Sequence, residues 1–246
     1  MIGGVPGSER PFVAADAVAS LSLLGRFQVR WLGEDIALPH SVQRLVAFVA
    51  LRTQPISRML AAVTLWSDGS EQQAGARLRT VLWRLRSQGC PLLRVRHADL
   101  SLSDLVRVDY WEAGAVAAGV IDSSDPTPSA VVWHDGLECD LLPDWDENWL
   151  LLDRERFREV RLHALEALCR RLSHQGHSAR AVEVGILAVA ADPLRESAHE
   201  ALLRAYLAEG NKGQAIRQYE RCRQLLRLEL GLEPSPSIQN LVSAIH

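Results

Sequence analysis

The sequence predicts a mainly α-helical protein with small β-sheets, in which an N-terminal α/β domain precedes an all-α domain. Alternating apolar residues around positions 21–38 and 92–102 are typical of short strands. From Trp145 onward, helical periodicity continues almost without interruption. Within this helical part, Gly176 and Gly210 recur at a spacing of 34 residues. Together these observations indicate two domains of different architecture.

The N-terminal elements have a recognisable order. A β-hairpin is expected over residues 21–38 and a buried helix over 42–52. A second helix is expected from Ser57, as its N-cap, to about residue 66. A long helix then begins at Glu71 and ends before Gly89, and two short strands follow over 92–96 and 100–102. Two helices joined by a short loop, with a β-ribbon after the second, predict a winged helix-turn-helix.

The long helix has an apolar back and an arginine-rich front. At about 100° per residue, its apolar positions share one arc, namely Ala74, Leu78, Val81, Leu82 and Leu85. Arg77, Thr80 and Arg84 form a stripe on one flank, whereas Arg79 and Arg86 lie on the other. A solvated basic face is one interpretation of such a helix. Because of the elements around it, we favour insertion into a DNA major groove, with Arg77, Arg79, Thr80 and Arg84 as recognition residues.

Other residues are candidates for phosphate contacts. Arg94 and Arg96 alternate with apolar residues in the first strand of the ribbon, so they should share one face of the wing and reach the sugar-phosphate backbone. Ser57 and Arg58 open a helix, where backbone N–H groups favour a phosphate, although a plain cap explains Ser57 equally well. Arg86 is assigned to an acidic neighbour, and Trp83 to packing under the wing rather than to DNA contact.

The C-terminal half is a succession of helices separated by glycine or proline. They are expected over residues 147–175, 178–191, 196–209, 212–229 and 236–245. The spacing of Gly176 and Gly210, and of Ala181 and Ala215, fits the 34-residue period of tetratricopeptide repeats. An ordinary helical bundle is the alternative. Residues 103–135 are expected to be a transition that contains a polar loop at 122–129.

Charge is distributed unevenly along the chain. The net charge is −3, yet residues 1–110 carry 13 basic and 9 acidic residues, and residues 71–97 hold six arginines against Glu71 alone. Such local basicity suits a polyanion. No apolar run could span a bilayer, and residues 1–19 lack the pattern of a secretory signal. We therefore expect a flexible tail over 1–19 and a cytoplasmic, nucleoid-associated protein.

No pattern in the chain predicts catalysis, a cofactor or a metal. The four cysteines form no close pairs, and a metal interpretation of Cys169, His174 and His177 is weaker than a polar helix end. The acidic residues around 144–153 suit the start of a helix, which explains them without a catalytic carboxylate pair. No nucleophile motif of the hydrolase type is present. The sequence therefore predicts a protein that is not an enzyme.

Several segments carry a family resemblance that extends from about residue 21 to the C-terminus. They are DLLPDWDENWLLLDRERF at 140–157, AVAADPLRESAH at 188–199, YLAEGNK at 206–212, AIRQYER at 215–221 and ELGLEPSP at 229–236. These segments resemble the SARP-type regulators (the Streptomyces antibiotic regulatory protein family). Such proteins join an OmpR-like winged helix to a tetratricopeptide-like bacterial transcriptional activation domain. The wing turn departs from the family, because it reads His97-Ala98-Asp99 where a glycine is usual.

The resemblance implies a winged-helix domain over residues 20–110 and an activation domain over 111–246. It also implies an activator of a secondary-metabolite gene cluster that binds direct repeats of double-stranded DNA beside a second protomer and recruits RNA polymerase holoenzyme. No phosphate-binding loop of the P-loop type occurs, so the chain looks like the small, ATP-independent kind. The alternative is a tetratricopeptide-type interaction module with a degenerate winged helix.

Overall fold

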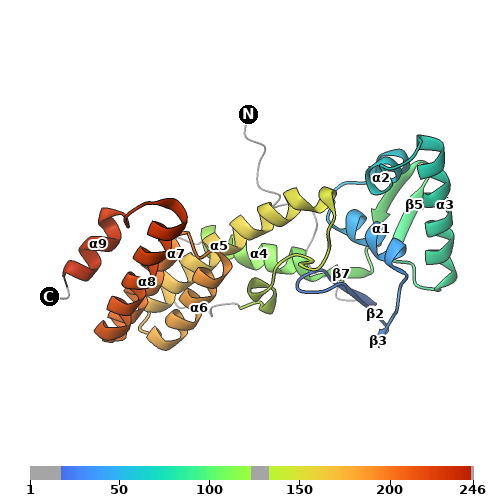
Figure 1. The fold of residues 1–246 in the computed structure, drawn as a ribbon. Coiled ribbons are helices and arrows are strands. Elements are labelled where there is room, and N and C mark those ends of the chain that lie inside the picture. The colour runs from blue at the N-terminus through green and yellow to red at the C-terminus, as the bar shows by residue number, and fades with distance from the viewer. Residues whose placement is uncertain (1–17, 123–132, 245–246) are drawn as a thin grey trace. The chain divides into compact units, whose positions relative to one another are not determined.

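A computed structural model describes residues 18–122 and 133–244 of the chain (Figure 1). The residues form two units, one of residues 1–115 with 134–157 and one of 116–133 with 158–246. The described part is mostly helical with small sheets near the N-terminus, as the sequence predicted. The polar loop expected at 122–129 lies, except for Asp122, outside the described residues, as does the tail up to residue 17.

The first unit opens with a four-stranded sheet in the order β3-β2-β1-β7. Its strands are β1 (Ala19–Ser22), β2 (Gln28–Trp31), β3 (Glu34–Asp35) and β7 (Val106–Val108). The expected hairpin is present as the antiparallel β1–β2–β3 run, and β7 adds a parallel partner to β1. Strand β1 takes in Ala19, which the sequence had placed in the tail and which is buried.

Three helices build the helix-turn-helix: α1 (His40–Ala50), α2 (Arg58–Leu65) and α3 (Glu71–Ser87). Helix α1 is apolar and buried over most of its length. Ser57 caps α2, because its hydroxyl accepts a hydrogen bond from the Leu60 N–H (3.1 Å). Ser70 and Gln73 form a reciprocal capping box at the start of α3. Gly89, in the left-handed region at φ +73°, follows the end of α3.

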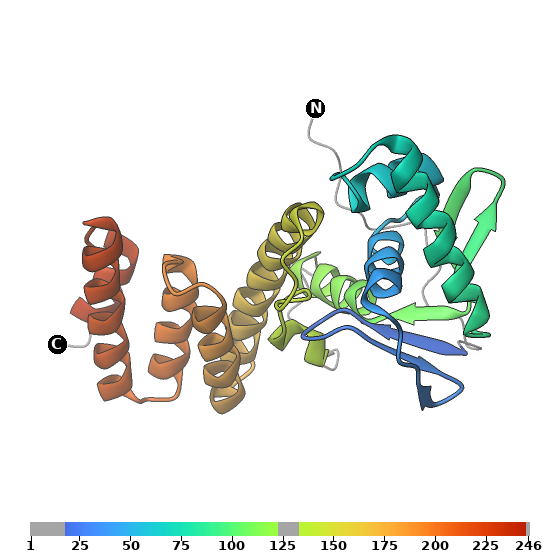
Figure 2. The ribbon, with the colours of Figure 1, turned by 45° about the vertical axis from the view of Figure 1, so that its right-hand side comes forward.

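The wing is the antiparallel ribbon of β5 (Leu93–Arg96) and β6 (Asp99–Leu102). Strand β4 (Ile56–Ser57) pairs with β6, so the wing and the start of α2 share a three-stranded sheet. His97 takes up the left-handed region at φ +51°, which supplies the turn without a glycine. In both ribbon views α3 lies beside this ribbon (Figure 2).

Helix α4 (Asp109–Asp122) follows β7, where the sequence had suggested only a transition. The segment 134–157 contains two 3-10 turns (Asp135–Glu138 and Asn148–Leu150) and the start of α5 (Leu151–His174). This segment packs on α1. Trp149 meets Phe48 edge-to-face at 5.2 Å between ring centroids, and Arg52 pairs with Asp153 at 2.8 Å. The first helix expected in the C-terminal half therefore starts four residues later than predicted, at Leu151.

The second unit consists of paired helices. After α5 come α6 (Ser178–Ala191), α7 (Glu196–Ala208), α8 (Lys212–Leu230) and α9 (Pro236–Ser243). Gly176 and Gly210 both have φ near +80°, and each ends a helix as the repeat predicted. Ala181 and Ala215 lie in the first turn of the following helices and are fully buried. The 34-residue pattern therefore corresponds to antiparallel helical pairs, visible for α6, α7 and α8 in Figure 2.

Candidate nucleic-acid interface

Helix α3 buries the apolar arc that the sequence predicted. Its five buried side chains are Ala74, Leu78, Val81, Leu82 and Leu85. The recognition candidates Arg77, Arg79, Thr80 and Arg84 are all exposed. Burial of one face against α1 and α2 fixes the orientation of the helix, because a rotation would expose that apolar arc to water. The opposite face of α3 is therefore presented to solvent as a rigid surface.

Two of the arginine candidates have acidic partners within the chain. Arg77 pairs with Asp68 of the loop before α3, with 2.7 Å between nitrogen and oxygen. The hydrogen bond from Arg77 holds the pKa of Asp68 below its ordinary value. In the wing, Arg94 pairs with Asp104. Both pairs are exposed, so each contributes little to stability and can be exchanged for another anion.

The other basic candidates have no such partner. Among the described residues, no carboxylate forms an ion pair with Arg58, Arg79, Arg84 or Arg96. Arg86 belongs to this group as well, so the acidic neighbour expected for it is not found in the described part of the chain. Five guanidinium groups on α2, α3 and the wing thus lack a carboxylate partner within residues 18–122 and 133–244, which favours an external anion.

The neutral candidates are engaged locally. The Thr80 hydroxyl donates to the Ala76 carbonyl one turn earlier (3.2 Å), which leaves its methyl group free for apolar contacts. The Ser57 hydroxyl serves as the α2 cap, and its own proton is free to donate to a phosphate. Both interpretations of Ser57, as a cap and as a phosphate contact, are therefore sterically compatible.

The wing is fixed to the helix-turn-helix by a backbone hydrogen bond. The N–H of Arg58 donates to the carbonyl of Ala98 in the wing turn (2.7 Å). On β5, Arg94 and Arg96 are exposed, whereas Leu93 and Val95, which alternate with them, are half-buried. This alternation places both arginines on one face of the wing, as the sequence predicted. The wing arginines and the start of α2 therefore have a defined mutual position.

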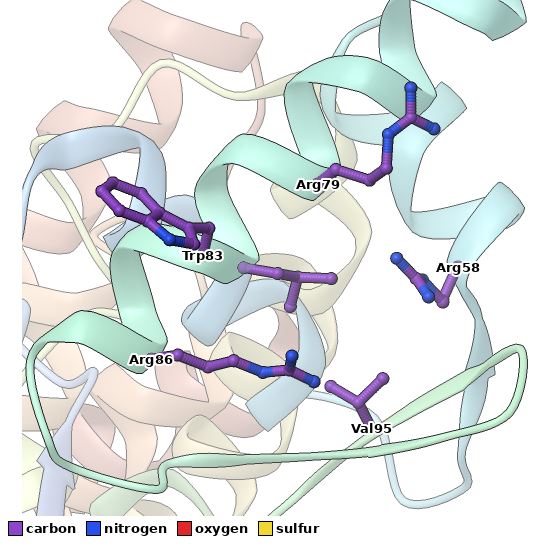
Figure 3. A pocket seen from close by; sticks show the side chains of 6 residues that line it. Arg58, Arg79, Trp83, Arg86 and Val95 are labelled. Carbon is purple, nitrogen blue, oxygen red and sulfur yellow. The ribbon is translucent and has the colours of Figure 1, made fainter.

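A hollow of about 190 Å³ lies between α3, the start of α2 and the wing (Figure 3). Its lining consists of Arg58, Arg79, Leu82, Trp83, Arg86 and Val95. Trp83 is 69% exposed, so the packing under the wing that the sequence suggested is wrong. Sequence reasoning also left out Arg86, although its position seven residues after Arg79 puts both on one flank of α3.

The aromatic residues of the C-terminal half mostly have packing partners. Trp145 stacks on Phe27 at 5.7 Å between ring centroids, and Phe157 packs on Tyr110 at 5.3 Å. Cys169 is fully buried, and burial raises the pKa of its thiol to about 12, which makes it unreactive. Over residues 18–122 and 133–244, no cluster of three metal-ligating side chains occurs. No helix in these ranges is both long and apolar enough to cross a membrane.

Comparisons with known proteins connect this architecture to a class of protein. Residues 129–246 match the family model of the bacterial transcriptional activator domain. This model describes a domain of transcriptional activators, and the relatives that the chain matches are named as regulatory proteins. The chain is 30% identical over 267 residues to the regulatory protein AfsR of Streptomyces coelicolor, an alignment that covers 100% of this chain. It is 27% identical over 259 residues, and 98% of its length, to AfsR of Streptomyces griseus. The chain is thus similar to these regulatory proteins along its whole length, as the resemblance to SARP-type regulators indicated.

The relatives are longer than this chain. It spans 26% of the length of either AfsR protein. Among solved structures, it is similar to Mycobacterium tuberculosis EmbR, which was determined in complex with a low affinity phosphopeptide. The TM-score is 0.72 at 18% identity, and the match covers 93% of this chain and 65% of EmbR. This similarity concerns the fold, and it includes both the winged helix and the helical part.

Proposed function

We propose that the chain is a sequence-specific DNA-binding transcriptional activator. In this proposal α3 enters the major groove and Arg77, Arg79, Thr80 and Arg84 face it. Arg94 and Arg96 of the wing, with Ser57 and Arg58 at the start of α2, contact the sugar-phosphate backbone. The observation that carries the proposal is the set of exposed guanidinium groups on the solvent face of α3 and beside it, most of them without an ion pair among the described residues, on a helix whose opposite face is buried.

The family resemblance extends the proposal from DNA binding to regulation. We infer that two protomers bind direct repeats near a promoter and that the helical domain recruits RNA polymerase holoenzyme. The controlled genes are those of a secondary-metabolite cluster, and the protein acts in the cytoplasm on the nucleoid. The paired helices of the second unit support the recruitment role, because stacked helical pairs form extended protein-binding surfaces.

Fluorescence anisotropy with two labelled duplexes tests the proposal. One duplex is the promoter region beside the chain's own gene, and the other has the same base composition in shuffled order. Preference for the promoter that survives an increase in salt indicates base readout, because phosphate attraction alone falls steeply with salt. Absence of binding to either duplex would instead favour the interaction module with a degenerate winged helix.

The variant Arg84→Ala tests the proposed orientation of α3 in the major groove. Arg84 is exposed on α3 and has no ion pair among the described residues, so its removal should leave the fold intact. A bidentate arginine–guanine contact contributes about 1–3 kcal/mol of discrimination. We therefore expect promoter affinity to fall about tenfold or more, with little change for the shuffled duplex. Arg180→Ala, an equally exposed arginine on α6, is the matched control. Full promoter affinity in the Arg84 variant would contradict this orientation of α3.

A further inference from the structure

The hollow beside the wing has the composition of an anion site. Arg58 comes from the start of α2. Arg79 and Arg86 are seven residues apart on one flank of α3. Figure 3 shows the guanidinium groups of Arg58 and Arg86 directed into the space between α3 and the wing, with Val95 at its base. No acidic residue lines it. The Arg79 guanidinium is directed away from this space in Figure 3, although its side chain lines the hollow, so three arginines border one small opening.

The floor of this site strengthens its field. Leu82 is 6% exposed, and Val95 is half-buried on β5, so apolar side chains rather than water lie beneath the guanidinium groups. Charges next to an apolar wall are screened less than charges in open water. A bound anion would compensate these positive charges through charge-assisted hydrogen bonds.

The arginines of the hollow differ from their neighbours in ion pairing. Arg77 and Arg94 each have a carboxylate partner within the chain, whereas the described residues offer none to Arg58, Arg79 or Arg86. Three of the five arginines that lack a carboxylate partner among the described residues thus line the hollow. The backbone hydrogen bond from Arg58 to Ala98 also ties α2 to the wing, so the site has fixed walls.

We propose that this hollow binds a single phosphate of the DNA backbone through Arg58, Arg79 and Arg86, and so sets the register of α3 in the groove. The inference rests on the proposed function and refines it: Arg79 becomes a backbone contact, and Arg86 joins the interface. A hollow of about 190 Å³ has room for one phosphate group with some water, but not for a base pair. Phosphate contacts fix the position of a protein on the duplex, whereas base contacts specify sequence.

Phosphate-ethylation interference tests the site directly. Ethylation removes the charge of individual phosphates, and those required for binding are depleted from the protein-bound fraction. The wild-type chain and the variants Arg58→Gln, Arg79→Gln and Arg86→Gln are compared on the promoter duplex at low salt. We expect all three variants to lose sensitivity at the same single phosphate and to retain it elsewhere. Arg86→Lys, which keeps the charge, should retain sensitivity at that phosphate.

Two controls separate the possible failures. Arg180→Gln removes an exposed arginine of the other unit and should leave the interference pattern unchanged. Loss of sensitivity at three different phosphates, or at none, would overturn the shared site while DNA binding itself stands. A wild-type chain that binds neither duplex would overturn the proposed function, and this site with it. Thermal unfolding of each variant shows that the fold is retained.

A free anion is the other source of the same chemistry. Inorganic phosphate is therefore titrated against the protein–DNA complex at constant ionic strength, with chloride as the reference anion. We expect phosphate to release DNA no more effectively than chloride, because a single free ion lacks the other contacts of the duplex. Stronger release by phosphate that disappears in Arg86→Gln would show a free-anion site and overturn the assignment to the DNA backbone.

Discussion

At the scale of single residues, ion pairing divides the basic face into two groups. Arg77 and Arg94 are held by Asp68 and Asp104, and the remaining arginines of the face have no partner among the described residues. A duplex must displace the two carboxylates or accept two negative charges close to its phosphates. Either outcome lowers affinity for every DNA sequence by a similar amount, because phosphates are common to all of them.

Asp68→Asn should therefore raise DNA affinity without a gain in specificity. The Arg77–Asp68 pair has side chains 47% and 69% exposed, so its loss should change the free energy of unfolding very little. We expect a rise of roughly two- to fivefold in the association constant for both promoter and shuffled duplexes at low salt. Anisotropy titrations measure it, with Glu34→Gln on β3 as the control. A gain for the promoter alone would indicate that Asp68 directs Arg77 toward a base.

His199 is buried in the second unit in its neutral form. Its Nε2–H donates to the carbonyl of Pro193 (2.9 Å), and its Nδ1 accepts from the amide of Gln218 (2.8 Å). A second proton on Nδ1 would face the amide donor and break this bond. Burial lowers the pKa of His199 below its ordinary value of 6.5, although Glu196 and Asp192 act in the opposite direction.

The stability of the chain should consequently fall on acidification. Because the folded pKa of His199 is the lower one, the unfolded chain binds the extra proton first as pH decreases below about 6.5. The stabilisation is present above that pH and is lost toward the folded pKa, by at most about 1.4 kcal/mol per pH unit. Urea unfolding at pH 7.5 and 5.5 measures this slope. His199→Gln should reduce it, whereas the exposed His177→Gln should not. An unchanged slope in His199→Gln would contradict the assignment.

At the scale of elements, the close approach of α6 and α7 depends on Gly185. A Cβ atom at this position would lie 3.1 Å from the Leu202 Cα and 3.0 Å from its Cδ1. The Leu202 Cα belongs to the backbone of α7, which cannot move without separating the two helices. An alanine here would therefore require the backbone of α7 to shift away from α6.

Gly185→Ala should destabilise the second unit in spite of its better helix propensity. Alanine gains about 1 kcal/mol over glycine within a helix, but overpacking costs about 1–3 kcal/mol. We expect a net loss of about 1 kcal/mol, measured as a lower midpoint in urea unfolding. Gly119→Ala in α4, where a Cβ meets no atom within 4 Å, is the control and should raise stability. A stabilised Gly185 variant would show that α6 and α7 can separate easily.

Local signals explain which elements were predictable. The apolar arc of α3, the Ser57 cap of α2 and the glycines at 176 and 210 are properties of neighbouring residues, and the structure has each where the sequence indicated. Strand β7 has only three residues, and it is defined by parallel pairing with β1, which lies far away in the chain. Helix α4 contains Gly114 and Gly119, which weaken its helical signal. Both elements depend on tertiary contacts.

At the scale of the whole molecule, residues 134–157 belong to the same unit as the helix-turn-helix. Glu147 accepts hydrogen bonds from Arg44 (2.8 Å) and from the indole N–H of Trp149 (2.7 Å), and Arg44 also donates to the Leu65 carbonyl at the end of α2. The sequence placed this segment in the C-terminal domain because the family motif continues through it. The candidate surface on α3 was foreseen, whereas the hollow with Arg86 requires the spatial position of the wing.

The salt dependence of DNA binding should follow the local charge of the interface rather than the net charge of −3. Of the unpaired arginines, Arg84 is assigned to a base, and Arg58, Arg79, Arg86 and Arg96 are available for phosphates. Arg58, Arg79 and Arg86 share one phosphate in the proposed site and Arg96 contacts another, so about two phosphate charges are neutralised. With a slope of about −0.9 per neutralised phosphate charge, the logarithm of the association constant should change by about −2 per logarithm of salt concentration.

Anisotropy titrations of the shuffled duplex between 50 and 200 mM salt, concentrations within the range where counterion release dominates, measure this slope. Arg86→Gln should make it shallower by less than one, because Arg58 and Arg79 still face the same phosphate, and Arg180→Gln should leave it unchanged, because Arg180 lies in the other unit. The acidic C-terminal half is expected to reduce the affinity but not the slope, since its charges do not displace counterions from the duplex. A slope near zero would mean that the arginines of α3 and the wing do not meet the backbone, and that the basic face serves another partner.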